Sequence, residues 1–376
     1  MEYRDLEKYD YRLPKELIRK CGVEPRDSAR LFVYDTGTDT VFHDTFANLA
    51  SYLPERAMLV LNETRVVPAR LMLSKETGGK IEAFVLANEI RDARPEAGEM
   101  PRSDESSGSD VSDPLIPILV DRKCVPGMKL FFPDGSRFEV VSQDENRFFV
   151  RLHSGKSLSD LLDAYGETPI PHYLEDAGAT RDEQALRRRY QTVFARSGAS
   201  VAAPTASLHF TDQVLGSLAG KGIETVRVGL DVGLGTFASL RPENFVSKTL
   251  HREHIRVSEA AAERLTRAKA EGRGMVAVGT TALRTLETVI VPGADTGMTE
   301  FRPYSGDTDI FIFPPHGFRS ADMLLTNFHL PKSSLMLLVE AFLRDKGAKR
   351  TLVSLYEEAI REGYAFYSFG DSMLIR

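Results

Sequence analysis

An asparagine and a histidine, Asn327 and His329, follow directly on a short apolar run at 323–326. Such a run is typical of a buried strand. A few residues later Ser333 or Ser334 can cap a new helix, because a serine oxygen accepts hydrogen bonds from the free amides of the first turn. A polar elbow between a strand and the amino end of a helix suits an anion or the polar edge of a ligand. The simpler alternative is a hydrophobic strand–helix unit whose loop happens to contain a histidine.

Polar or glycine-rich segments follow three other apolar runs. The runs at 57–61, 223–230 and 274–278 lead respectively to Asn62 and Arg65, to Gly233 and Gly235, and to Thr280, Thr281, Arg284 and Glu287. Glycine lets the backbone approach a ligand closely, and Thr280 is placed to cap the helix that follows it. Arg284 and Glu287 are spaced to share one face of that helix. The alternatives are a simple turn at the glycines, and a pairing of Glu63 with Arg65 or Arg70 after the first run.

From about residue 200 to the carboxyl terminus, predicted strands and helices alternate. This alternation favours an α/β core with parallel strands. The carboxyl ends of parallel strands meet at one edge of a sheet, where open α/β folds bind their ligands. We therefore expect Asn62, Gly233, Gly279 and Asn327 to lie along one edge.

Arg187, Arg188 and Arg189 form a run of positive charge within a helix predicted over 181–190. Three consecutive side chains cannot share one face of a helix. A solvated helix surface is the simpler explanation of such a run, and a contact with phosphate is the functional one.

Between 71 and 152 the pattern changes to short strands separated by turn residues, predicted at 80–87, 115–120, 129–132, 137–141 and 147–152. A series of short strands without helices is typical of a small β-barrel. We therefore predict a mixed α/β catalytic domain made of 1–72 and 153–376, with a β-barrel domain inserted at 73–152. A segment at about 91–113, rich in Ser, Asp, Glu, Gly and Pro, is predicted to be a disordered surface loop.

Composition limits the class of protein. A chain of 376 residues exceeds what one hydrophobic core usually serves. The formal net charge of −6 argues against a protein that coats nucleic acid, although a local basic patch can still bind RNA. Cys21 and Cys124 form no metal or disulfide pattern, which favours a reducing compartment. The amino terminus is polar and the apolar runs are too short to span a bilayer, so we expect a cytoplasmic protein with no membrane contact.

Several longer strings occur in one order along the chain. They are LNETRVVPARL (61–71), RYQTVFA (189–195), SVAAPTASLHFT (200–211), VGLGTF (232–237), VGTTALRTLE (278–287), TDIFIF (308–313), TNFHLPKSSLMLLVEAF (326–342) and FYSFGDSMLI (366–375). As an ordered set they resemble the S-adenosylmethionine:tRNA ribosyltransferase-isomerases of queuosine synthesis. The resemblance covers most of the chain outside the β insertion and the loop.

The resemblance implies an enzyme that moves the ribosyl part of S-adenosylmethionine onto 7-aminomethyl-7-deazaguanine at the tRNA wobble position. The ribose would be rearranged to an epoxycyclopentane, which gives epoxyqueuosine and releases adenine and methionine. S-adenosylmethionine would be consumed as a co-substrate, and no metal is expected. The partner would be a tRNA with a queuosine-type anticodon, and we expect a monomer. The family fold, an α/β domain interrupted by a small β-barrel, agrees with the change of pattern at 71–152.

This reaction needs particular groups. The sulfonium makes the neighbouring carbon acidic, so a general base must remove that proton, and departing adenine needs a proton or a hydrogen bond. A histidine near its ordinary pKa can serve either role. We expect His209 and His329 to be the acid–base pair, with Glu287 or Glu253 orienting one of them or replacing it as base. The expected substrate-binding residues are Asn62, Arg65, Thr205, Gly233, Gly235, Thr280, Thr281, Arg284 and Asn327, and the expected tRNA contacts are Arg187, Arg188 and Arg189.

The chain departs from the family pattern at a few positions. Ser207 stands where the family typically has Gly, Glu63 where it has Asp, and Arg252 where it has Ser. A second hypothesis is therefore a paralogue of the same fold that acts on a different acceptor. A third is a non-catalytic RNA-binding protein, whose affinity for RNA would be salt-sensitive and independent of S-adenosylmethionine.

Overall fold

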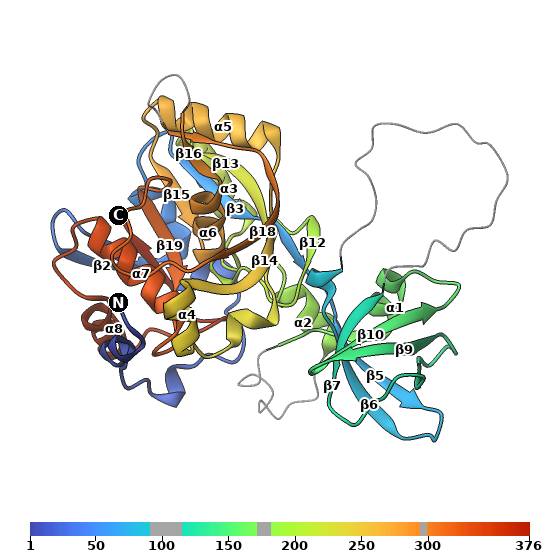
Figure 1. Ribbon diagram of the computed structural model, residues 1–376. Helices are drawn as coiled ribbons and strands as arrows, with labels where there is room; N and C mark the ends of the chain where they lie inside the picture. Colours follow the sequence, from blue (N-terminus) through green and yellow to red (C-terminus); the bar gives the residue numbers. More distant parts are fainter. Residues whose placement is uncertain (91–114, 171–181, 294–298) are drawn as a thin grey trace. The chain divides into compact units, whose positions relative to one another are not determined.

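The computed structural model describes residues 1–90, 115–170, 182–293 and 299–376 (Figure 1). The chain forms two compact units, Met1–Val66 with Ile170–Arg376, and Val67–Pro169. The boundaries predicted from the sequence, at 72 and 153, lie within the second of these units. The segment predicted to be a disordered loop, 91–113, lies outside the described residues.

The first unit contains a mixed sheet of nine strands within the described ranges. In sheet order the strands are β18 (Tyr304–Ile310), β14 (Thr249–Val257), β13 (Glu224–Asp231), β3 (Met58–Asn62), β15 (Met275–Val278), β19 (Met323–Asn327), β20 (Ser372–Ile375), β1 (Arg30–Asp35) and β2 (Thr40–Thr45). The central strands β13, β3, β15 and β19 are parallel to one another, and the flanking strands β14 and β20 are antiparallel to their central neighbours. Two short pairs lie apart from this sheet: β4 (Thr64–Val66) with β12 (Ser197–Ser200), and β16 (Ile290–Pro292) with β17 (Thr299–Phe301).

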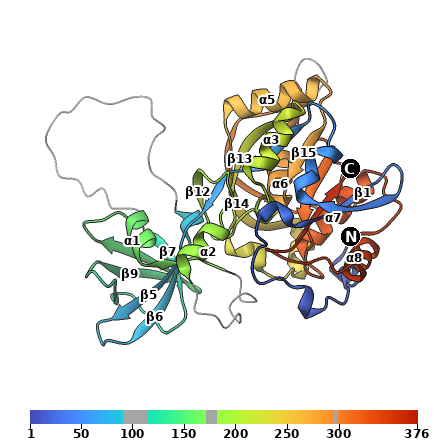
Figure 2. The ribbon, with the colours of Figure 1, turned by 180° about the vertical axis from the view of Figure 1, so that it is seen from behind.

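Helices cover both faces of the sheet (Figures 1 and 2). The α-helices of this unit are α2 (Glu183–Arg189), α3 (Asp212–Gly220), α4 (Pro242–Ser247), α5 (Glu259–Ala270), α6 (Thr280–Val289), α7 (Ser334–Asp345) and α8 (Leu352–Arg361). The 3₁₀ helices are η1 (Tyr3–Tyr9), η2 (Lys15–Leu17), η3 (Arg26–Ser28), η4 (Phe46–Tyr52), η7 (Thr205–Ser207) and η8 (Leu234–Phe237). Helices α5 to α8 pack on one face, and η4 and α3 pack on the other.

The central strands are apolar at successive positions because both of their faces are covered. In β3, Met58 and Val60 pack with α5 to α8, whereas Leu59 and Leu61 pack with η4 and α3. Side chains alternate between the two faces of a strand, so burial on both faces removes the usual alternation of apolar and polar residues. The mixed α/β class expected from the sequence is confirmed.

The register brings the carboxyl ends of the central strands to one edge. Val278 of β15 pairs with Leu61 of β3 on one side and with Leu325 of β19 on the other. On the far side of β3, Asn62 pairs with Val228 of β13. The parallel arrangement expected from the alternation of strands and helices is therefore confirmed.

The second unit is almost entirely β-structure. Its elements are β5 (Arg70–Lys75), β6 (Lys80–Val85), η5 (Ala87–Glu89), β7 (Ile116–Val120), β8 (Lys129–Phe131), β9 (Arg137–Asp144), β10 (Arg147–His153), α1 (Leu158–Tyr165) and β11 (Gly166–Glu167). The strands pair in the order β11-β5-β6-β7-β10-β9-β8, with a further pairing between β5 and β8. Asp134 and Gly135, a pair typical of a hairpin turn, join β8 to β9, and the φ of 87° at Gly135 explains the glycine there.

Two local predictions are wrong. The apolar string TDIFIF at 308–313 is typical of a buried strand, but β18 covers Tyr304–Ile310 at the edge of the sheet and is mostly half-buried. Thr280 was expected to cap α6, but Gly279 is the N-cap and Thr280 is the first helical residue. Gly279 has a φ of 89°, a conformation that favours glycine.

A buried aspartate holds the carboxyl-terminal turn against the start of β1. Asp371 is fully buried, and its carboxylate accepts hydrogen bonds from the backbone amides of Arg30 at 3.0 Å and Ala365 at 2.8 Å. It also accepts from Arg19 Nη1 at 3.1 Å. Because these donors are tied to one carboxylate, its loss would leave buried amides without an acceptor.

Replacing Asp371 by alanine should therefore lower the free energy of unfolding by about 3 kcal/mol. Glu357→Ala, at an exposed position of α8, should change it by no more than about 0.5 kcal/mol. Urea denaturation of the three proteins measures both changes. Equal stabilities of the two variants would contradict the anchoring role of Asp371.

Candidate active site

A cavity of about 430 Å³ lies where the central strands end. Val232 follows β13, Gly279 follows β15 and Asn327 ends β19, and all three line this cavity. A concave site at such strand ends is where open α/β sheets bind small ligands. Among the residues expected to act in binding or catalysis, the lining includes Thr205, Thr280, Thr281, Arg284, Asn327 and His329.

The lining also includes residues that sequence reasoning did not single out. Among them are Tyr3, Leu6, Tyr190, Ala202, Ala203, Tyr367 and Ser368. Tyr190 and Tyr367 lie in the strings that carry the family resemblance, and that was the available signal. Tyr3 and Leu6 belong to η1 near the amino terminus, and no pattern in the sequence indicated where that segment packs.

Asn327 ties the end of β19 to two other segments of the cavity wall. Its Oδ1 accepts a hydrogen bond from Thr205 Oγ1 at 2.8 Å, and its Nδ2 donates to the carbonyl of Asp371 at 3.4 Å. The side chain is buried, so it orients η7 and the carboxyl-terminal turn relative to β19. Asn327 therefore shapes the wall as well as lining the cavity.

His329 is fixed from its backbone and its ring. Its amide donates to Tyr356 Oη at 3.1 Å, and its carbonyl accepts from the Tyr11 hydroxyl. The imidazole Nε2 lies 3.0 Å from Thr326 Oγ1. Burial lowers the pKa of His329 to about 3, so the ring is neutral at physiological pH. A neutral imidazole can accept a proton or a hydrogen bond, but it has no proton to give as an imidazolium acid.

The elbow after His329 is held by the amino-terminal segment. Lys332, with a φ of 55°, donates its backbone amide to the carbonyl of Tyr9 at 3.1 Å. Its ammonium lies 2.8 Å from a Glu7 oxygen and 2.9 Å from an Asp10 oxygen. Ser333 caps α7 by accepting from the amide of Met336, as the sequence predicts.

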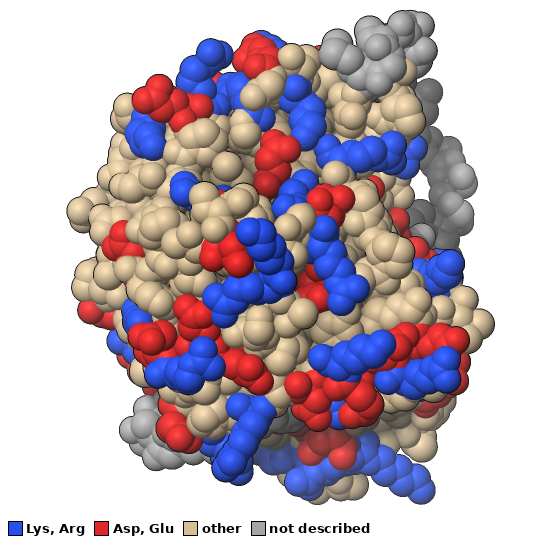
Figure 3. Space-filling model, turned by 90° about the vertical axis from the view of Figure 1, so that its left-hand side faces the viewer, with Lys and Arg blue, Asp and Glu red and all other residues tan. Residues whose placement is uncertain are grey.

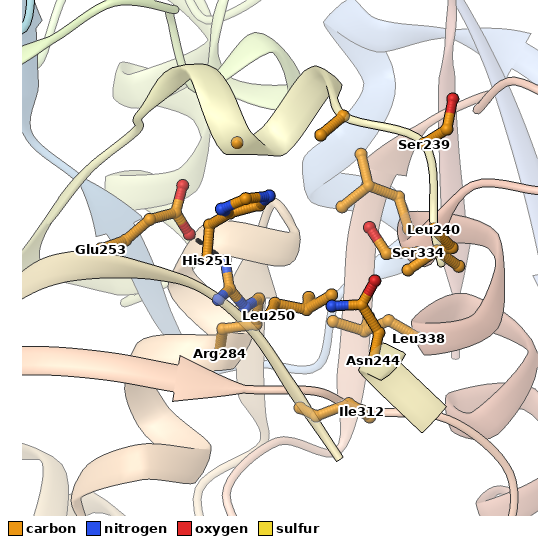
Figure 4. A pocket seen from close by; sticks show the side chains of 13 residues that line it. Ser239, Leu240, Asn244, Leu250, His251, Glu253, Arg284, Ile312, Ser334 and Leu338 are labelled. Atoms are coloured by element: carbon orange, nitrogen blue, oxygen red, sulfur yellow. Dashed lines mark hydrogen bonds and ion pairs between the residues drawn. The ribbon is translucent and has the colours of Figure 1, made fainter. Parts of the chain in front are cut away.

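A second, smaller cavity of about 30 Å³ shares Arg284 with the first (Figure 4). Gly235, His251 and Glu253 also line it. Arg284 donates from Nη1 to a Glu253 oxygen, and the other Glu253 oxygen accepts from the amide of Gly233 at 3.3 Å. A Cβ at position 235 would collide with the His251 ring, so only glycine lets β14 approach η8 this closely.

Other expected site residues lie apart from the lining of both cavities. His209 is buried against Phe46, its Nδ1 lies 3.3 Å from the carbonyl of Arg26, and burial lowers its pKa. Asn62 is buried and bonds through its amide to the backbone of Leu230. Arg65 lies in β4.

Glu287 shares helix α6 with Arg284 but serves a different contact. It accepts from the amide and hydroxyl of Ser320, and its Oε2 lies 3.2 Å from His316 Nε2. Burial favours the neutral carboxyl, but the bonds from His316 and Ser320 outweigh that effect and hold the pKa of Glu287 below its usual value. Glu287 therefore fixes the loop around 316–320, on the basis of these contacts.

The three arginines of α2 differ in their contacts. Arg187 Nε lies 3.0 Å from Glu183, and Arg189 Nε lies 3.9 Å from Glu24. Arg188 and Arg189 are exposed, and neither cavity is lined by any of the three. Their contact with tRNA stays a prediction.

Within the described ranges, no group of three or more His, Cys, Asp and Glu side chains is arranged to hold a metal ion. In the same part of the chain, no helix has the length and apolar composition needed to cross a membrane.

The chain matches the family model described as queuosine biosynthesis protein over residues 6–375. A protein of Nitratidesulfovibrio vulgaris named S-adenosylmethionine:tRNA ribosyltransferase-isomerase is 42% identical over 371 residues, which cover 98% of this chain and 96% of that protein. A protein of Clostridioides difficile with the same name is 38% identical, and the match covers 100% of both chains. The crystal structure of an S-adenosylmethionine tRNA ribosyltransferase from Thermotoga maritima has a TM-score of 0.51 and 28% identity, covering 98% of this chain and 100% of that one. Matches of this extent show that the chain belongs to the queuosine biosynthesis protein family.

Proposed function

We propose that this protein is an S-adenosylmethionine-dependent tRNA ribosyltransferase-isomerase. The observation that carries the proposal is the full-length likeness to proteins of that name, at 42% and 38% identity. The proposed reaction transfers and isomerises the ribosyl part of S-adenosylmethionine onto 7-aminomethyl-7-deazaguanine at the tRNA wobble position. Its products are epoxyqueuosine-tRNA, adenine and methionine.

The larger cavity supports this proposal as the binding site of S-adenosylmethionine. Its volume of about 430 Å³ is within the range of pockets that enclose small ligands. Aromatic side chains (Tyr3, Tyr190 and Tyr367) line it together with the polar groups on α6 and β19. The hydroxyl of Thr281 is buried there and has no hydrogen-bond partner among the described residues, so it is available to a substrate.

Two further features belong to the same proposal. We infer that the second unit is a small β-barrel, since β5 pairs with β6 on one side and with β8 at the other end of the series. On the face shown in Figure 3, basic and acidic side chains are interspersed. That face therefore presents no broad surface of one sign.

The state of His329 limits its role in the proposed reaction. The ring lines the cavity and is neutral, so it can hold a substrate hydroxyl or amine through a hydrogen bond, whereas its low pKa makes it a weak base for the proton beside the sulfonium. It does not supply the proton that departing adenine requires, because the imidazolium form is scarce above pH 4. We therefore propose that a different group assists the departure of adenine.

Adenine release from S-adenosylmethionine tests the function. The wild-type protein should release adenine with tRNA that carries 7-aminomethyl-7-deazaguanine, and should release none with the same tRNA carrying guanine at that position. Product tRNA should contain epoxyqueuosine by mass spectrometry. Absence of release with the modified tRNA would overturn the proposed function, and release that ignores the modification would point to a different acceptor.

A pH series tests the role of His329. His329→Ala should lower kcat by about 100-fold, the scale of one acid–base or hydrogen-bonding group. Because burial lowers the pKa of His329 to about 3, the wild-type ring is neutral throughout pH 5–8, and protonation removes its contribution only as the pH falls towards 3. The ratio of wild-type to variant kcat should thus be flat between pH 5 and 8. If this ratio instead rises with pH about a midpoint near 6.5, the ring titrates like an ordinary histidine, and the buried neutral state proposed for it is wrong.

A further inference from the structure

Arg284 is a buried guanidinium that is only partly satisfied. Its exposed fraction is 6%. Nη1 donates to Glu253, whereas Nε and Nη2 are buried and have no hydrogen-bond partner in the described parts of the chain. Burying charged donors without acceptors is costly, so an unpaired edge of this kind is suited to an anionic ligand.

Arg284 belongs to the lining of the candidate site. It is the fifth residue of α6, and it lines both the cavity at the strand ends and the smaller one beside β14. Figure 4 shows its guanidinium beside Glu253 and below His251. A volume of about 30 Å³ accommodates one or two waters, which is the scale of one carboxylate group.

The cationic side chains around the larger cavity also point to Arg284 as the residue that can bind an anion. Within the described lining, the cationic side chains are Arg284 and Lys332. Lys332 already faces two carboxylates, at 2.8 and 2.9 Å. Arg284 faces one carboxylate and keeps two donor groups for another. A second anion at its Nε–Nη2 edge would complete a bidentate pair, the geometry that guanidinium favours.

We propose that the Nε–Nη2 edge of Arg284 binds the carboxylate of the methionyl part of S-adenosylmethionine. This inference rests on the proposed function, and it assigns a specific atom group of the substrate to a specific edge of the arginine. The carboxylate is the anionic group of that substrate, and it leaves with methionine rather than with the transferred ribose. Arg284 thus binds a part of the substrate remote from the bonds that break, where binding energy can be used for orientation.

The same geometry makes Glu253 a positioning residue. Its oxygens accept from Arg284 and from the amide of Gly233, so it fixes the guanidinium plane relative to the turn after β13. A carboxylate used in this way aims the arginine at the ligand. Glu253 then acts through Arg284, in place of the role of base considered from the sequence.

A phosphate of the tRNA is the other anion that could meet this edge. The two sources differ in which substrate the arginine recognises. If the ligand is the carboxylate, removing it from S-adenosylmethionine weakens the reaction only while Arg284 is present. If it is a phosphate, removing the arginine impairs the use of tRNA and leaves the response to the carboxylate unchanged.

The test compares S-adenosylmethionine with decarboxylated S-adenosylmethionine, at saturating modified tRNA, by kcat/KM for adenine release. In the wild-type protein the decarboxylated compound should be about 10- to 100-fold poorer, as expected for one charge-assisted bidentate contact. Arg284→Met should be impaired with S-adenosylmethionine and should use both compounds with nearly equal kcat/KM. Arg252→Ser, which removes an exposed arginine next to Glu253, should keep the wild-type ratio.

Each possible result of this experiment either supports or overturns the proposal. Equal use of the two compounds by the wild-type protein would overturn it without any variant. A wild-type ratio that persists in Arg284→Met, with a raised KM for tRNA, would assign the edge to a phosphate and also overturn it. If Arg284→Met does not fold, Arg284→Lys keeps the charge but loses the planar fork, and should reduce the ratio. Absence of adenine release by the wild-type protein with either compound would instead be a failure of the proposed function.

Discussion

The parallel register of β13, β3, β15 and β19 is the constraint on which the site depends. It requires four segments that are distant in the sequence to leave the sheet at one edge. Asn62 supports this arrangement at the point where β3 ends. Its amide accepts from the backbone amide of Leu230 at 3.0 Å and donates to the carbonyl of the same residue at 2.9 Å, so it continues the pairing of β3 with β13 by one more position. Asn62 was expected to bind substrate, but its observed contacts stabilise the edge of the sheet.

Beyond that edge, polar side chains are fixed by burial. Arg284 and Glu253 share a bond in a place with little solvent, Asn327 bonds to Thr205, and Lys332 is held by acidic residues near the amino terminus. Such groups are costly to bury unless they are paired, and their pairing limits the conformations that the cavity wall can adopt. Among the described residues of the cavity lining, buried donors without a partner remain on Arg284, Thr281 and Tyr190, and these are groups that a ligand can satisfy.

Much of this architecture follows from local sequence patterns. The apolar runs that end at Asn62, Val278 and Asn327 are long enough to be buried strands, and the alternation with helices implies their parallel pairing. The cap at Ser333 is equally local. What the sequence could not supply is the partner of each polar side chain. Arg284 and Glu287 are one turn apart on α6, yet one bonds to β14 and the other to the loop that contains His316.

The remaining differences between the sequence predictions and the structure come from packing between segments that are distant in the sequence. The segment η1 contributes to the cavity because Tyr9 and Glu7 contact the elbow at Lys332, more than 300 residues away in the chain. His209 belongs to a string that carries the family resemblance. Its ring, however, packs against Phe46 and lies beside a carbonyl of η3, so its observed contacts are structural. No periodicity within the sequence encodes such contacts, since they depend on how complete elements meet.

The central claim is that the cavity at the strand ends holds S-adenosylmethionine during ribosyl transfer. Ala238 is exposed and lines both cavities, so Ala238→Trp should fill the site and still permit folding. The measurement is the transfer of label from ribose-labelled S-adenosylmethionine to modified tRNA, with Ala270→Trp on the exposed surface of α5 as the matched control. We predict that Ala238→Trp lowers kcat/KM by at least about 100-fold and that the control changes it by less than about twofold. Full transfer by a folded Ala238→Trp protein would contradict the account.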